Sequence, residues 1–167
     1  MTAPLTILGT GMAGIQLARQ VRARDAARPI TLITADSGDD YSKPMLSTGF
    51  AKGLPPSRLA SRDALSLAEG LDAVVRTHTR VTSIDPLTKC LEIGAETLPY
   101  GELVLATGAA PVAPFAIPPA LASRVFAIND LDDYRVFHAA LARLARPARV
   151  AIIGSGYIGL EFADVYT

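Results

Sequence analysis

Residues 5–14 read Leu-Thr-Ile-Leu-Gly-Thr-Gly-Met-Ala-Gly, an apolar run that leads into three glycines at G-x-G-x-x-G spacing, and a helix-compatible sequence follows. Gly9 lets the chain turn tightly off a strand, Gly11 lets the backbone approach a pyrophosphate, and Gly14 lets the new helix pack closely on the strand. The start of such a helix offers free N–H groups and a partial positive charge to phosphates. This stretch therefore predicts a strand, a nucleotide-binding turn and a helix.

The next apolar run strengthens a motif that would be weak on its own, since glycines also occur in ordinary turns. Residues 30–34 predict a second strand, and Asp36 follows it. Asp36 lies 22 positions after Gly14 (36 − 14 = 22), near the spacing of about 20 expected for a carboxylate that binds a ribose. As an alternative, Asp36 forms a turn before Gly38.

The same pattern occurs again near the other end of the chain, where residues 149–153 are followed by Gly154, Gly156 and Gly159. The two motifs lie 145 positions apart (154 − 9 = 145). Eight residues follow Gly159 (167 − 159 = 8), whereas a βαβ unit needs roughly thirty residues. We therefore expect a second dinucleotide-binding domain that is started and truncated.

Periodicity and turn residues predict the remaining elements. They are strands over 4–9, 30–34, 89–93, 97–100 and 103–106, a β-rich stretch over 73–85, and helices over 12–25, after Pro44, over 57–69 and over 129–145, the last capped by Asn129 or Asp130. The expected fold is α/β and Rossmann-like, with three layers: a parallel central sheet, covering helices and a small antiparallel β layer. We divide the chain into an incomplete first domain at 1–110, a connection with an amphipathic helix at 111–147, and the start of a second domain at 148–167.

Composition excludes several classes of function. Sixteen basic residues balance sixteen acidic ones, so no basic field points to nucleic acid. Cys90 is the single cysteine, which leaves no Cys-x-x-Cys redox pair and no cysteine-rich zinc site. The uncharged stretch 103–123 contains four prolines that would break a membrane-spanning helix. Since the N-terminus also lacks the basic start of a secretory signal, we expect a cytoplasmic protein without a membrane segment.

Together these segments resemble the N-terminal portion of the FAD-dependent pyridine nucleotide-disulfide oxidoreductases. Glycine motifs identify only this superfamily of flavoproteins with two dinucleotide-binding domains. Residues 41–49, Tyr-Ser-Lys-Pro-Met-Leu-Ser-Thr-Gly, make the chain most similar to the rubredoxin–NAD(+) reductases within it.

The resemblance implies two cofactor sites. The residues implied for FAD are Gly9, Thr10, Gly11, Met12, Ala13 and Gly14 around the pyrophosphate, Thr34, Ala35 and Asp36 at the adenosine ribose, Lys43 and Pro44, the backbone of Val81 at the adenine, and Ala106, Thr107 and Gly108. Those implied for NAD(P)H are Gly154, Gly156, Tyr157, Ile158, Gly159 and Glu161. We assign no catalytic side chain and no metal ligand.

The implied activity is electron transfer from NADH (or NADPH) through FAD to a small iron protein such as rubredoxin. The missing Cys-x-x-Cys pair agrees with an external acceptor. A first alternative is a non-catalytic nucleotide-binding remnant of such a reductase. A second, a dehydrogenase with one Rossmann domain, is disfavoured because no tyrosine of the chain is followed by lysine at Tyr-x-x-x-Lys spacing.

Overall fold

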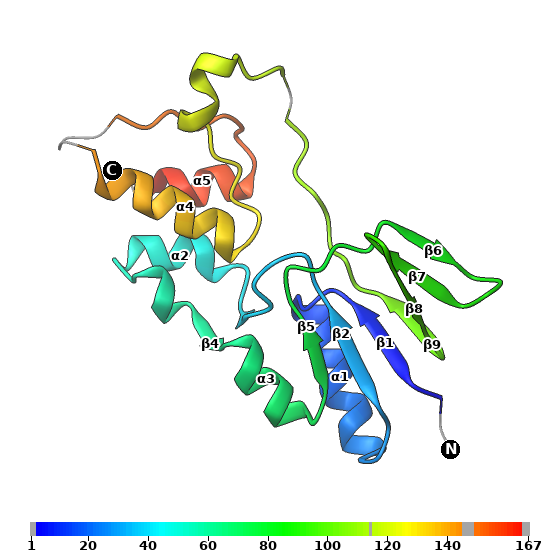
Figure 1. Ribbon diagram of the computed structural model, residues 1–167. Coiled ribbons are helices and arrows are strands. Elements are labelled where there is room, and N and C mark those ends of the chain that lie inside the picture. The colour runs from blue at the N-terminus through cyan, green and yellow to red at the C-terminus, as the bar shows by residue number, and fades with distance from the viewer. Residues whose placement is uncertain (1–2, 114, 145–148, 165–167) are drawn as a thin grey trace. The chain divides into compact units, whose positions relative to one another are not determined.

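The computed structural model describes residues 3–113, 115–144 and 149–164. Its N-terminal part contains a sheet of four parallel strands (Figure 1). The strands lie in the order β5-β2-β1-β9 and are β1 (Leu5–Leu8), β2 (Ile30–Ile33), β5 (Val74–Arg76) and β9 (Glu102–Leu105). In register, Leu5 lies between Ile30 and Glu102. The predicted strands at 4–9, 30–34 and 103–106 are confirmed to within one residue at each end.

Two helices cover one face of this sheet. They are α1 (Met12–Arg24) and α3 (Ala64–Leu71). Because side chains of a strand alternate between its two faces, every second residue of β1 and β2 points toward these helices. The buried cluster on this side contains Leu5, Ile7, Ile30 and Leu32 from the strands and Ile15, Ala18, Leu67 and Leu71 from the helices. Burying each large side chain contributes about 1.5–3 kcal/mol, so this layer stabilises the framework of the turn after β1.

An antiparallel sheet covers the opposite face. Its strands are β6 (Ser83–Asp85), β7 (Cys90–Ile93) and β8 (Glu96–Pro99) in sequential order, with Gly94 at φ +61° in the turn between β7 and β8. Leu91 of β7 is fully buried against Leu8 and Ile33. The expected three layers, with a parallel central sheet and a small antiparallel layer, are therefore confirmed.

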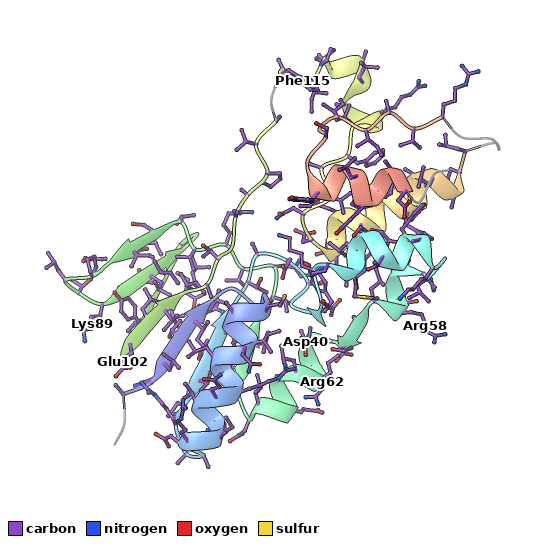
Figure 2. The ribbon with its side chains drawn as sticks, turned by 180° about the vertical axis from the view of Figure 1, so that it is seen from behind. Asp40, Arg58, Arg62, Lys89, Glu102 and Phe115 are labelled. Carbon is purple, nitrogen blue, oxygen red and sulfur yellow. The ribbon has the colours of Figure 1, made fainter. Side chains whose placement is uncertain are left out.

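A bidentate ion pair connects the parallel sheet with the antiparallel sheet. The guanidinium of Arg76, on β5, donates to both carboxylate oxygens of Glu96, on β8, at 2.8 and 2.6 Å. The hydrogen bonds from Arg76 lower the pKa of the Glu96 carboxyl below its ordinary value. At the start of β9, Arg28 pairs with Glu102, which Figure 2 labels, at 2.7 Å.

The prediction of a helix over 57–69 is wrong for the first half of this range. This region begins with a 3₁₀ turn, η1 (Pro56–Arg58), and continues as strand β4 (Ala60–Arg62), which pairs with β3 (Asp40–Tyr41). The helix α3 starts only at Ala64, because the Asp63 side chain accepts a hydrogen bond from the Ser66 backbone N–H at 2.8 Å and caps the helix there. The β-rich stretch 73–85 likewise divides into β5 and β6, separated by a loop in which His78 has φ +48°.

Chain contacts divide the protein into two compact units, Met1–Tyr41 with Ser61–Gly108, and Ser42–Ala60 with Ala109–Thr167. The first unit contains the parallel sheet, the antiparallel sheet, α1, α3, β3 and residues 61–62 of β4, whereas η1 lies in the second unit. The second contains α2 (Met45–Ala51), the 3₁₀ turn η2 (Pro119–Arg124), α4 (Leu131–Ala142) and α5 (Tyr157–Asp164). Ring contacts between Phe50, Tyr134 and Phe137 join α2 to α4.

The predicted amphipathic helix corresponds to α4, and Asp130 caps it by accepting from the Asp133 N–H at 2.8 Å. Residue 145, where that prediction ends, lies outside the described residues. The strand expected over 149–153 is not formed: the side chain of Ile153 is 63% exposed, and no strand is present between residues 149 and 156. A strand is stable only when its backbone groups find a partner strand, and none pairs with this segment among the residues described.

Within the described ranges, no helix combines the length and the apolar character needed to cross a membrane.

Candidate nucleotide-binding site

The first unit places most of the predicted FAD residues at the carboxyl ends of its parallel strands. The N–H of Gly9 donates to the Ile33 carbonyl at 2.7 Å, and the N–H of Ala106 donates to the Leu8 carbonyl at 2.8 Å. Strand order reverses here, since the chain passes from β1 to β2 on one side and later adds β9 on the other. Open α/β sheets bind ligands in the crevice at such a switch point, so this edge is the first candidate site.

The three glycines after β1 differ in whether neighbouring atoms leave room for a side chain. Gly9 has φ +109°, and a Cβ there would overlap the carbonyl oxygen of Ala106. A Cβ on Gly14 would overlap the carbonyl oxygen of Gly9. Gly11 has an ordinary backbone conformation (φ −70°, ψ 179°), and a Cβ there would meet nothing within 4 Å.

Packing within the protein thus explains Gly9 and Gly14 but not Gly11. The open space over Gly11 is where a bound pyrophosphate would need a bare backbone. The first turn of α1 carries no acidic residue, and Gly11 provides no side-chain cap for its N–H groups. Of the residues around this turn, Met12 and Ala13 are exposed, whereas Thr10 is buried. The loop therefore fits the phosphates of a dinucleotide on its outer side.

The loop after β2 holds the candidate ribose residue. Asp36 is half-buried, and its Oδ1 accepts hydrogen bonds from Thr34 Oγ1 at 2.7 Å and from the Gly38 N–H at 2.9 Å. The turn that the sequence suggested for Asp36 is therefore present, and it fixes the carboxylate next to exposed Ala35. Turn formation and ribose binding are compatible, because a carboxylate has further lone pairs to offer.

The remaining FAD candidates of this unit differ in exposure. Ala106 is half-buried, while Thr107 and Gly108 are exposed and Gly108 has φ +68°. Val81 packs against the buried cluster of Leu8, Ile33 and Leu91.

Lys43 and Pro44 belong to the second unit. The Lys43 ammonium donates to Asn129 Oδ1 at 2.8 Å, a partner that sequence reasoning missed because 86 positions separate the two. Exposed Pro44 directly precedes α2, and its carbonyl accepts from Thr48 Oγ1 at 2.9 Å. A cofactor phosphate that binds Lys43 would thus either replace the side-chain amide of Asn129 or bind the ammonium together with it.

The second glycine loop repeats the local geometry of the first. Gly154 has φ +117°, and a Cβ on Gly159 would overlap the Gly154 carbonyl oxygen and lie 3.5 Å from Ile152 Cγ2. In the first loop the corresponding distance, from Gly14 to Ile7 Cγ2, is 3.4 Å. Like Gly11, Gly156 faces open space. The loop has therefore taken the nucleotide-binding form without a formed strand before it.

The helix after this loop carries the last three predicted contacts. Tyr157 is 89% exposed and Ile158 is 68% exposed. Glu161 accepts a hydrogen bond from Ser47 Oγ at 2.8 Å. Ser47 was not among the predicted site residues, because nothing in the local sequence connects it with a residue 114 positions away.

Among the residues that the structure describes, no cluster of three or more His, Cys, Asp and Glu side chains could hold a metal ion. Cys90 is a free, half-buried cysteine on β7.

The sequence profile of the family described as "Pyridine nucleotide-disulphide oxidoreductase" matches residues 3–167. A "Rubredoxin-NAD(+) reductase" of Alcanivorax borkumensis is 41% identical over 161 residues, which cover 96% of this chain and 41% of the relative. A "Nitric oxide reductase FlRd-NAD(+) reductase" of Pectobacterium atrosepticum is 37% identical, over 98% of this chain and 41% of the relative.

A solved structure shows the same fold. The chain resembles the reductase-containing structure described as a "covalent putidaredoxin reductase-putidaredoxin complex", with a TM-score of 0.84, 27% identity, and coverage of 99% of this chain and 40% of that chain. The chain thus spans about two fifths of the length of the proteins that it matches.

Proposed function

Because the chain belongs to the pyridine nucleotide-disulphide oxidoreductase family, we propose that it binds FAD and NAD(P)H and passes electrons from NADH through FAD to a small iron protein. The open space over Gly11 carries this proposal, since nothing in the protein's own packing accounts for a glycine there. Gly156, in the equivalent position of the second loop, supports a second nucleotide site in the same way.

The chain's own residues would bind and orient the two nucleotides. Gly11 and the first-turn N–H groups of α1 would receive the FAD pyrophosphate, and Asp36 would accept hydrogen bonds from a ribose. The loop at Gly156 would receive the pyrophosphate of NAD(P)H. When bound, FAD supplies the redox chemistry, taking a hydride and giving up electrons singly. No side chain of the described residues is needed as an acid, base or nucleophile for hydride transfer.

We further propose that residues 1–110 belong to an FAD-binding domain, 111–147 to a connection, and 148–167 to the beginning of an NAD(P)-binding domain. The duplicated glycine loops support this division. A rubredoxin-like acceptor is proposed because relatives are named after rubredoxin and FlRd. A cytoplasmic location belongs to the proposal, since thiols such as that of Cys90 remain reduced there.

The test is an anaerobic titration of the FAD-loaded full chain with NADH and, separately, NADPH, followed through the visible flavin bands. The proposal predicts bleaching by one of the two coenzymes and recovery of the bands when oxidised rubredoxin is added. Gly156→Ala should retain FAD but slow its reduction by about tenfold or more, because a Cβ would occupy the phosphate position. Bands that neither coenzyme bleaches would contradict the proposal and favour a nucleotide-binding remnant.

A further inference from the structure

A buried hydroxyl holds the helix of the second glycine motif against α2. Ser47, on α2, is 4% exposed, and its Oγ lies 2.8 Å from Glu161 Oε2 on α5. The same Oγ lies 3.3 Å from the Pro44 carbonyl, a longer and weaker contact. A hydrogen bond to a charged acceptor is stronger than one between neutral groups, so the carboxylate of Glu161 is the main partner of Ser47. Both residues belong to the second unit, where α2 and α5 contact each other.

Glu161 also faces the surface next to the second glycine loop. A shallow hollow runs along α5, and its lining includes Tyr157 and Glu161, which are one helical turn apart. Glu161 lies two positions after Gly159, the glycine that closes the loop. One carboxylate oxygen of Glu161 is thus held by Ser47, while the residue also lines the hollow beside Tyr157.

We propose that Ser47 is a positioning residue for pyridine-nucleotide binding: it fixes the Glu161 carboxylate at the edge of the hollow, in the orientation in which this group meets NAD(P)H. The inference rests on the proposed function. An unrestrained glutamate loses considerable rotamer freedom when it is ordered by a ligand. A glutamate already held by Ser47 loses less, so the coenzyme binds more tightly to the pre-oriented group.

Ser47 also connects the two nucleotide segments of the chain. It lies three residues after Pro44, in the segment proposed for FAD, and it holds a residue of the segment proposed for NAD(P)H. A serine in this place therefore influences coenzyme affinity without touching the coenzyme itself.

The test measures binding of NAD⁺ and of NADP⁺ to the oxidised, FAD-loaded full chain by isothermal titration calorimetry, which needs no turnover. Ser47→Ala is expected to raise the Kd of the preferred coenzyme about tenfold, because the coenzyme must then order a Glu161 side chain that Ser47 no longer holds. Thr48→Ala is the matched control. It removes the neighbouring hydroxyl of α2, which bonds the Pro44 carbonyl at 2.9 Å, and should leave the Kd unchanged.

A double-mutant cycle separates positioning from a structural role. In a Glu161→Ala background, Ser47→Ala should have no further effect on the Kd, because its partner is gone. The Ser47→Ala variant should keep the FAD content of the wild type, and its thermal midpoint should fall only modestly, as expected for the loss of one hydrogen bond. Should Ser47→Ala fail to fold, Ser47→Cys, nearly the same size but a weak donor, is expected to change the Kd in the same direction.

Two results would overturn the inference while leaving the proposed function intact: an unchanged Kd for Ser47→Ala, or an equal rise in Kd with and without the Glu161 side chain. Wild-type protein that retains FAD but binds neither coenzyme would instead overturn the proposed function, and the inference with it.

Discussion

Replacing Gly14 by alanine tests whether close packing of α1 on the turn after β1 builds the first glycine loop. The new Cβ would overlap the Gly9 carbonyl oxygen and lie 3.1 Å from the Gly9 carbonyl carbon. Gly9 cannot easily move away, because its N–H is bonded to the Ile33 carbonyl at 2.7 Å and its φ is +109°. The helix must therefore shift off β1. Such overpacking costs about 1–3 kcal/mol, and the better helix propensity of alanine returns up to about 1 kcal/mol.

We therefore expect Gly14→Ala to lower the free energy of unfolding by about 1–2 kcal/mol. With a urea dependence of about 2 kcal/mol per molar, the midpoint of urea unfolding falls by about 0.5–1 M, measured by far-UV circular dichroism without cofactor. Gly11→Ala is the control. Its Cβ meets open space, and the loss at the helix N-cap is offset by lower entropy of the unfolded chain, so the change stays within about 0.5 kcal/mol. Equal midpoints for the two variants would refute this explanation of Gly14.

Two further predictions concern groups away from the glycine loops. The pKa of Glu96 is lowered in the folded protein by its hydrogen bonds with Arg76, so this pair stabilises the fold above the ordinary carboxyl pKa and its contribution disappears as the pH falls through the lowered value. Urea midpoints of wild type and Glu96→Gln should therefore differ at about pH 7 and converge as the pH falls below the lowered pKa of Glu96; a difference that does not shrink with falling pH would contradict this. Tyr134 is 0% exposed, and among the described residues its hydroxyl has no hydrogen-bond partner. Removing that buried hydroxyl in Tyr134→Phe should raise the free energy of unfolding by about 1 kcal/mol, and a clearly lower thermal midpoint would show that the hydroxyl is bonded.

Local sequence was sufficient where local physics decides the structure. The apolar runs predicted as strands at 4–9, 30–34 and 103–106 correspond to β1, β2 and β9 of a sheet covered on both faces, and glycine spacing identified the turn after β1. Asp130 could be recognised as a helix cap because its partner, the Asp133 N–H, is three residues away.

Prediction from the sequence failed where a residue far away in the chain determines the local structure. Residues 149–153 have the composition of a strand, yet no strand forms there among the described residues, because composition supplies no pairing partner. Over 57–69, the cap at Asp63 and pairing of Ala60–Arg62 with β3 overrode helical periodicity. The contact between Ser47 and Glu161 could not be predicted either, since only the fold brings the two residues together.

The proposal that the first glycine loop holds FAD is tested most directly by mixing the purified full chain with FAD, removing unbound FAD by gel filtration, and recording the visible spectrum. We predict that the wild type keeps the flavin bands at nearly one FAD per chain, whereas Gly11→Ala, equally well folded by circular dichroism, loses most of them. A folded wild-type protein that emerges colourless, or a Gly11→Ala variant that retains as much FAD as the wild type, would contradict the proposal.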